Sequence, residues 1–367
     1  MLNTKTLSNI CFFKANVAFI ICAMFIGLSC GKRKPPQPPI EKVAQRTEIA
    51  GMQRGNVILL SWNLPARNAD AGSILNLSRI DVYRLAEPQN SPLSLSEEDF
   101  AARSTLISSV PVSERDFQKS ELNFVDTLEF GSQNARLRYA IRFVNASGQK
   151  AAFSNFLLIE PTAKVAGSPF SLSGKVLEES IELDWKAPPE NVDGSKPANI
   201  IGFNVYRFDG ESSSAKILNK NPVTGNNFID RTFNFGKDYR YFVRTVSLGS
   251  NSQPLESLNS TIIEINPRDI FPPGAPNSIT IAAAPNYLSI FFAVNFEKDV
   301  VGYQIYRSNN SKLPLSEWSL LTKDLLTTNT FQDTNVESGK TYFYYLTAVD
   351  RNGNVSDKSV IISETAP

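Results

Sequence analysis

The chain of 367 residues carries 37 basic and 36 acidic side chains, is 42% apolar and contains no histidine. Its near-zero net charge excludes the strong basic field of a nucleic-acid-binding protein, and we expect no nucleic-acid partner. The lack of histidine removes the commonest general base and the commonest metal ligand. The three cysteines, Cys11, Cys22 and Cys30, all precede residue 31, so we expect no disulfide in the rest of the chain.

The N-terminus has the pattern of a targeting segment. Lys5 and Lys14 give a weakly basic start, and residues 15–29 are almost wholly apolar. A helix of that length spans roughly 22 Å, which is less than the roughly 30 Å core of a bilayer. The segment therefore predicts a signal peptide over residues 1–29.

The signal segment ends in GLSC at 27–30, which resembles the bacterial lipobox, although Gly27 stands where leucine is commonest. The resemblance implies cleavage before Cys30 and a lipid on that cysteine. An uncleaved signal anchor is the alternative. Residues 30–40 then form a basic, Pro-rich tether, which lies against headgroups or stays in solvent. Gly31, directly after the cysteine, resembles the pattern of lipoproteins sent to the outer membrane.

One phrase occurs three times further along the chain: RIDVYRLAE at 79–87, GFNVYRFDG at 202–210 and GYQIYRSNN at 302–310. Alternating apolar strands precede each copy, and aromatic strands with a short closing strand follow. Pro and Gly mark the joints. Short strands, frequent turns and about 100 residues per unit are typical of all-β sandwiches.

Within each unit we predict the core from alternation. Trp62, Trp185 and Phe292 end the strands before the repeated phrase, in phase with the aliphatic residues that face inward. Tyr239 and Tyr342 begin a later core strand, where Leu137 stands in the first unit. We therefore expect the first unit to lack a tyrosine-corner hydrogen bond.

With YFYYLTAVD at 342–350 and its counterparts, residues 41–367 resemble the fibronectin type III family. The resemblance implies three immunoglobulin-like sandwiches in tandem. We place them at 41–160, with an insert at 85–122 that includes a short helix, at 161–267 and at 268–367. Placed end to end with short Pro-rich joints, they would form a semi-rigid rod.

The charged residues of the repeats are interpreted as structural. Since Arg84, Arg207 and Arg307 recur in every unit, we expect them on the sheet surface. The recurring acids, which are Asp126, Asp230 and Asp333, are expected at strand ends.

No residue pattern predicts catalysis, a cofactor or a metal site. DRNGNVS at 350–356 begins like an EF-hand loop, but Val355 replaces the required glycine, and a hairpin turn is the better interpretation. The candidate binding residues lie in loops. They are Glu97, Glu98 and Asp99 in the insert, where a helix N-terminus is the alternative, and Trp318, where packing on its own sheet edge is the alternative.

These features predict a non-catalytic, lipid-anchored protein of the cell envelope that binds an envelope or surface protein or a polysaccharide. One alternative is a periplasm-facing outer-membrane scaffold for envelope assembly, because CGKRKPPQPP at 30–39 resembles the start of small lipoproteins associated with lipopolysaccharide transport. The other is an ancillary carbohydrate-binding module protein.

Overall fold

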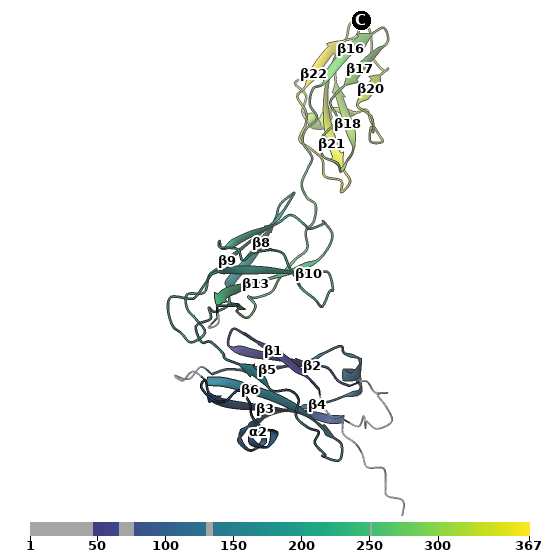
Figure 1. Ribbon diagram of the computed structural model, residues 1–367. Helices are drawn as coiled ribbons and strands as arrows, with labels where there is room; N and C mark the ends of the chain where they lie inside the picture. The colour runs from purple at the N-terminus through teal and green to yellow at the C-terminus, as the bar shows by residue number, and fades with distance from the viewer. Residues whose placement is uncertain (1–46, 66–76, 130–134, 250–251) are drawn as a thin grey trace, which may run out of the picture. The chain divides into compact units, whose positions relative to one another are not determined.

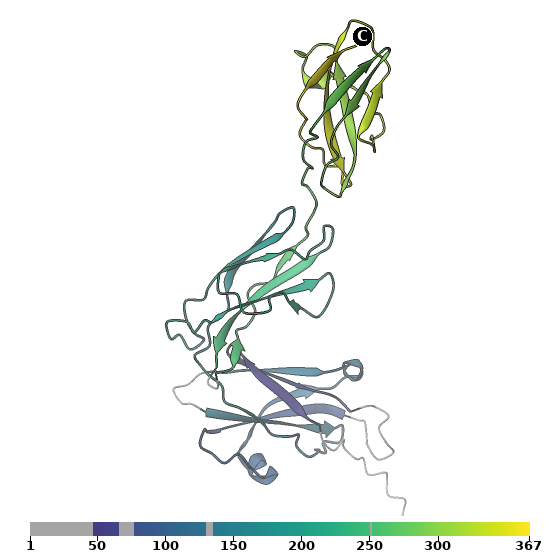
Figure 2. The same ribbon diagram turned by 45° about the horizontal axis from the view of Figure 1, so that its top comes forward.

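The computed structural model describes residues 47–65, 77–129, 135–249 and 252–367, and these ranges are nearly all β. In them the strands form six antiparallel sheets, so the predicted all-β fold is confirmed (Figures 1 and 2). Leu59–Asp126 falls in one compact unit and Pro161–Pro367 in another. The domain limits expected from the sequence stay predictions.

The first sandwich pairs a sheet in the order β1-β2-β5 with one in the order β4-β3-β6-β7. In the chain, an α-helix precedes β4 and a 3₁₀ helix follows it. The elements are β1 (Ile49–Arg54), β2 (Val57–Trp62), β3 (Leu77–Pro88), α2 (Glu97–Arg103), β4 (Thr105–Pro111), η1 (Glu114–Gln118), β5 (Leu122–Thr127), β6 (Ala135–Asn145) and β7 (Leu157–Ile159).

The second sandwich pairs β12-β9-β8 with β11-β10-β13-β14, and β15 also pairs with β13. Its strands are β8 (Phe170–Val176), β9 (Ile181–Lys186), β10 (Gly202–Asp209), β11 (Lys216–Ile217), β12 (Asn227–Asp230), β13 (Tyr239–Leu248), β14 (Pro254–Glu256) and β15 (Ile263–Ile265).

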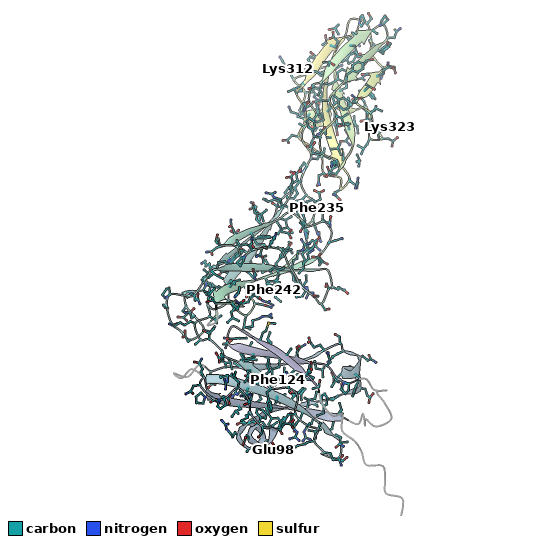
Figure 3. All side chains as sticks on the ribbon, in the orientation of Figure 1. Glu98, Phe124, Phe235, Phe242, Lys312 and Lys323 are labelled. Carbon is teal, nitrogen blue, oxygen red and sulfur yellow. The ribbon has the colours of Figure 1, made fainter. Side chains whose placement is uncertain are left out.

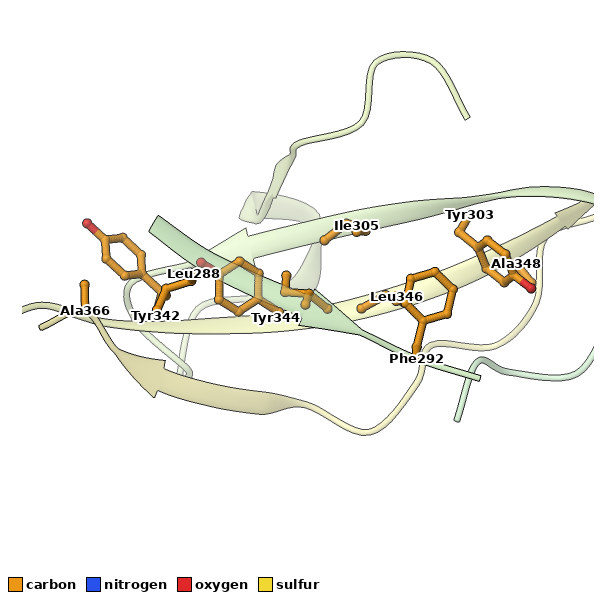
Figure 4. Close-up of a cluster of buried hydrophobic side chains, with 10 residues drawn as sticks. Leu288, Phe292, Tyr303, Ile305, Tyr342, Tyr344, Leu346, Ala348 and Ala366 are labelled. Carbon is orange, nitrogen blue, oxygen red and sulfur yellow. The ribbon is translucent and has the colours of Figure 1, made fainter. Parts of the chain in front are cut away.

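The third sandwich pairs β16-β17-β20 with β19-β18-β21-β22. Its elements are β16 (Thr280–Ala284), β17 (Tyr287–Phe291), β18 (Val300–Ser308), η2 (Leu315–Glu317), β19 (Ser319–Leu320), β20 (Thr330–Asp333), β21 (Thr341–Asp350) and β22 (Ile362–Thr365). Figure 4 shows its core, in which Leu288, Ile305 and Tyr344 from three strands meet between the two sheets.

The same strand order recurs in all three sandwiches: the first, second and fifth strands form one sheet, and the third, fourth, sixth and seventh form the other. This is the arrangement that the fibronectin type III resemblance implies. Alternation builds the core, because Trp62, Trp185 and Phe292 are buried between the sheets. The hydroxyls of Tyr239 and Tyr342 accept hydrogen bonds from backbone N–H groups five residues earlier, at 2.9 and 3.0 Å.

Arg207, Asp230 and Tyr241 form a polar network that joins the two sheets of the second sandwich. Arg207 on β10 and Tyr241 on β13 lie in one sheet, whereas Asp230 ends β12 in the other. The guanidinium of Arg207 and the hydroxyl of Tyr241 both donate to Asp230 Oδ2. All three residues are at most 2% exposed. This ion pair therefore belongs to the core of the sandwich.

The first and third sandwiches repeat this network. In the first, Arg84 Nη1 and the hydroxyl of Tyr139 donate to Asp126 Oδ2 at 2.8 and 2.6 Å. In the third, the corresponding bonds to Asp333 Oδ2 measure 2.8 and 2.7 Å and come from Arg307 and Tyr344. We refer to the three copies as the inter-sheet networks.

The expectation that these arginines lie on the sheet surface is wrong for Arg207, which is buried; the side chains of Arg84 and Arg307 are 34% and 16% exposed, but their guanidinium groups bind the aspartate of the opposite sheet. In a strand, residues two apart face the same side, so each arginine shares the inward face of the aliphatic residue before the tyrosine. An inward charge is tolerated because a carboxylate on the opposite sheet neutralises it and accepts its hydrogen bond.

Burial and hydrogen bonding act in opposite directions on these groups. Burial alone would lower the pKa of Arg207, but its hydrogen bonds to Asp209 and Asp230 outweigh burial and raise that pKa. For Asp230, burial would raise the pKa, but hydrogen bonds from Thr232, Tyr241 and Arg207 lower it. Burial, together with the charge of Asp230, raises the pKa of Tyr241. The fold thus stabilises the charged pair and the neutral tyrosine.

The glycine that opens two of the repeated phrases allows a close chain crossing. A Cβ on Gly202 would lie 2.7 Å from Pro222 Cβ, and one on Gly302 would lie 2.8 Å from Leu325 Cβ. In both sandwiches the segment before the fifth strand passes over this glycine. The second and third sandwiches therefore share this close crossing of the backbone as well as the alternating strand pattern.

Asp230→Asn is expected to lower the free energy of unfolding of the second sandwich by about 3 kcal/mol, because it leaves the Arg207 charge buried without its partner. Hydrogen exchange of the β10 and β13 backbone amides measures the change in the intact chain. The control is Asp184→Asn, which alters an exposed aspartate on the neighbouring β9. Equal exchange in both variants would contradict a stabilising inter-sheet network.

The stability of the second sandwich should also depend on acid pH. Because the folded chain holds the pKa of Asp230 below its ordinary 3.8, folded Asp230 binds fewer protons near that pH than unfolded Asp230 does. Its contribution is complete above that value and is lost as the pH falls further. We expect local amide protection to decrease below about pH 4, and to decrease less in Asp230→Asn. Equal acid sensitivity in both proteins would contradict this assignment.

Candidate functional site

The three acidic candidates of the insert begin α2. Ser96 is the N-cap: its hydroxyl oxygen accepts a hydrogen bond from the backbone N–H of Asp99 at 3.0 Å, and it donates to the Asp99 carboxylate. Glu97, Glu98 and Asp99 occupy the first turn, where negative charge is favoured by the helix dipole. Glu98, labelled in Figure 3, and Asp99 are exposed. The hydrogen bonds between Asp99 and Ser96 are those of a helix start.

The insert folds over the outer face of its own sheet, and both views show α2 beside β3 and β6 (Figures 1 and 2). Phe100 of α2 is fully buried, and its ring centroid lies 5.1 Å from that of Phe153 and 4.7 Å from that of Phe156. Arg136 and Arg138 on β6 donate to backbone carbonyls of residues 91–93 and share the carboxylate of Glu87. The insert is thus anchored as a cover for this face.

Trp318 was a candidate for stacking on a ligand, with packing on its own sheet edge as the alternative, and its contacts are those of the alternative. Its side chain is 6% exposed, and its ring lies 5.2 Å from the ring of Tyr345 on β21. The indole N–H donates to the carbonyl of Leu313 at 3.3 Å. Because the ring faces its own sheet, Trp318 covers the outer face of the third sandwich, as Phe100 covers that of the first.

In the second sandwich, no aromatic residue from the segment after β10 covers the corresponding outer face of the sheet. Its segment 210–216, GESSSAK, contains no aromatic residue that could act as a cover. The rings of Tyr206 and Phe242 stack on each other at 4.9 Å, and Arg244 lies 4.5 Å above Tyr206. The guanidinium of Arg240 lies 4.6 Å from the centroid of the Phe208 ring. Arginine side chains of the sheet itself therefore occupy this face.

A polar cleft lies at one end of the second sandwich, where the turn after β10, the turn before β13 and the end of β15 meet. It consists of two adjoining hollows of about 550 and 510 Å³, which share Gly210, Asp238 and Tyr239. We refer to it as the end cleft. Backbone pairing places the turns together, because Gly210 N–H donates to the Asp238 carbonyl at 2.8 Å.

Charged side chains of both signs line the end cleft in equal number. The carboxylates are Asp209, Glu211, Asp238 and Glu264. The cationic groups are Arg207, Lys216, Lys237 and Arg240. Ile265 adds apolar surface. Because Arg207 is 2% exposed and pairs with Asp230, the groups accessible in the cleft are four carboxylates and three cations, which supply hydrogen-bond acceptors and donors with little net charge.

Several of these groups are held in place by neighbours. Asp209 accepts from Arg207 Nε and from Lys216 Nζ, both at 2.6 Å. Burial would raise the pKa of Asp209, but these two hydrogen bonds outweigh it and lower the pKa. Asp238 accepts from Asn266 at 2.6 Å. Such fixed groups can bind the hydroxyls of a ligand without first being ordered.

The sequence reasoning missed the end cleft. Two features of the sequence belong to the cleft: the Asp-Gly turn at 209–210 and the GKDYR segment at 236–240. They place charged residues at the end of β10 and at the start of β13, which pair with each other. Each turn alone resembles any solvated hairpin, and only the pairing of β10 with β13 brings them together.

A cluster of three carboxylates occurs in the part of the third sandwich that the structure describes. Asp269, Asp299 and Asp350 each place one oxygen within 4.8 Å of the others. Asp350 is 2% exposed and accepts hydrogen bonds from the backbone of Asn352 and Asn354, both at 2.8 Å. These contacts are those of a hydrogen-bonded turn.

The predicted signal peptide, the tether and Cys30 lie outside the described residues. Within the described ranges, no helix has the length and apolar character needed to cross a bilayer.

Similarities to known proteins are found in sequence and in structure. No family model matches the sequence. Exoglucanase B of Cellulomonas fimi is 26% identical over 238 residues, which are 62% of this chain and 20% of that protein. The chain thus spans about a fifth of that relative. The crystal structure of chicken CNTN1 FN1–FN3 domains aligns with 88% of this chain and 99% of its own, at 13% identity and a TM-score of 0.27.

Trp318→Ala is expected to destabilise the third sandwich by about 3 kcal/mol, because it removes a buried ring from the outer face of β21. Hydrogen exchange of β18 and β21 measures the loss. Leu320→Ala, at a neighbouring side chain that is 40% exposed, is the control and should cost much less. Unchanged exchange in Trp318→Ala would mean that the ring contributes no packing.

Proposed function

We propose that the protein is a non-catalytic, lipid-anchored component of the cell envelope. Its fibronectin type III-like sandwiches form a semi-rigid series that holds binding surfaces away from the membrane and contacts a polysaccharide or a protein. The membrane partner is reached through the lipid on Cys30, and the Pro-rich tether 30–40 spaces the sandwiches from it.

The inter-sheet networks carry this proposal. In each sandwich the repeated arginine, aspartate and tyrosine bind one another and join the sheets. The polar residues that recur are therefore engaged in holding the scaffold, which suits a spacer built from repeated modules. Binding then falls to features that differ among the sandwiches.

The end cleft is the feature best suited to binding. It combines a volume fit for a small ligand segment with fixed donors and acceptors. A role in binding polysaccharide also agrees with the relationship to a protein named as an exoglucanase. The insert 85–122 and Trp318 are assigned to covering their own sheets and not to this role.

Fractionation of cells that express the protein, with and without Cys30→Ala, tests the anchor. The native protein is expected in the membrane fraction, and Cys30→Ala in the soluble fraction, because the variant cannot receive the lipid. Ser29→Ala, which keeps the cysteine and a small residue before it, is the control and should stay membrane-bound. A Cys30→Ala protein that remains in the membrane would contradict lipid anchoring and favour a signal anchor.

Protease treatment of intact cells then distinguishes the two orientations. Cleavage from outside is expected for a surface protein that binds external partners. Resistance until the outer membrane is opened would favour the periplasmic scaffold suggested by CGKRKPPQPP at 30–39.

A further inference from the structure

The end cleft constrains the chemistry of its ligand through its balance of charge. Four carboxylates and three accessible cationic groups line the two hollows, because Arg207 is 2% exposed and pairs with Asp230 in the core. An anion such as a phosphate, a sulfate or a uronate would meet more like charges than opposite ones, and a metal ion would meet three cationic groups beside the carboxylates. Net Coulomb attraction, which drives the binding of such ligands, is therefore small here.

A neutral polyhydroxylated ligand fits the same surroundings well. Each sugar hydroxyl both donates and accepts a hydrogen bond, so it can lie between a carboxylate and a cationic group. Hydrogen bonds to charged partners are stronger than those between neutral groups. The partly exposed side chain of Ile265 supplies apolar surface for the C–H groups of a sugar ring.

The cleft is also prepared for such a ligand before binding. Asp209 is fixed by two cations, Asp238 by Asn266, and Arg240 by the carbonyl of Ser212 at 3.0 Å and by the ring of Phe208. At the rim, Lys237, Glu211 and Glu264 are exposed. The fixed groups set the orientation of a ligand, and the rim groups remain open to it.

We propose that the end cleft of the second sandwich binds a segment of an uncharged glycan. This inference rests on the proposed function and narrows it to one sandwich and to one class of polysaccharide. The rim residues contact the glycan directly, and Arg240 marks the direction toward the outer face of β10 and β13 along which a longer chain would extend.

Calorimetric titration of the whole chain in its Cys30→Ala form tests the proposal. The probes are the neutral hexasaccharides cellohexaose, laminarihexaose and maltohexaose, with hexagalacturonate as the anionic comparison. We expect at least one neutral probe to bind, with an affinity that changes little between low and high salt. Preference for hexagalacturonate, or affinity that falls steeply with salt, would overturn the proposal.

Substitution at the rim locates the site. Lys237→Ala and Glu264→Gln are each expected to weaken binding of the neutral probe by about tenfold, the loss of one hydrogen bond to a charged group. Lys340→Ala is the matched control, because Lys340 is the equivalent residue of the third sandwich and pairs with Glu337 at 2.6 Å. Equal affinity in all three variants would overturn the assignment to the cleft.

These outcomes are separable from a failure of the proposed function. If no neutral probe binds, the glycan proposal is overturned, whereas fractionation still decides whether the chain is an anchored envelope protein. If Cys30→Ala stays in the membrane, the anchor is wrong, and probe binding by the cleft is unaffected.

Discussion

An ion pair between opposite sheets is the interaction on which each sandwich depends. Arg207 and Asp230 come from strands in different sheets, and Tyr241 joins the same carboxylate from a third strand. Apolar burial holds the layers together but permits many relative positions, since it has no direction. A buried charge whose carboxylate partner lies on the opposite sheet permits few of them. The inter-sheet network thus fixes the register between layers that hydrophobic packing leaves loose.

The sequence predicted what depends on local periodicity. Alternation located the core strands and the buried Trp62, Trp185 and Phe292, because side-chain direction in a strand depends only on position. It did not identify the environment of Arg207, although the same alternation points that residue inward. Its partner Asp230 is 23 residues away on another sheet, and only the fold brings the two together.

The end cleft could not be predicted from strand alternation either, because its residues are also brought together only by the fold. The end cleft draws its charges from three segments that are separated in the chain and adjacent only after β10, β13 and β15 pair. The segment between the third and fourth strands differs among the three sandwiches. It supplies Phe100 in the first sandwich and Trp318 in the third, each as a cover for the outer sheet face. In the second sandwich it is short and forms one wall of the cleft.

The inter-sheet network has a consequence for where such a chain can work. The fold moves the pKa of Arg207 up, that of Asp230 down and that of Tyr241 up, each away from neutrality. With no histidine in the chain, and every cysteine before residue 31, the sandwiches have no side chain that ordinarily titrates between about pH 5 and 8. Neither proton uptake nor thiol chemistry can loosen them in that range. The stability of the sandwiches is therefore independent of pH between about 5 and 8 and of thiol redox conditions.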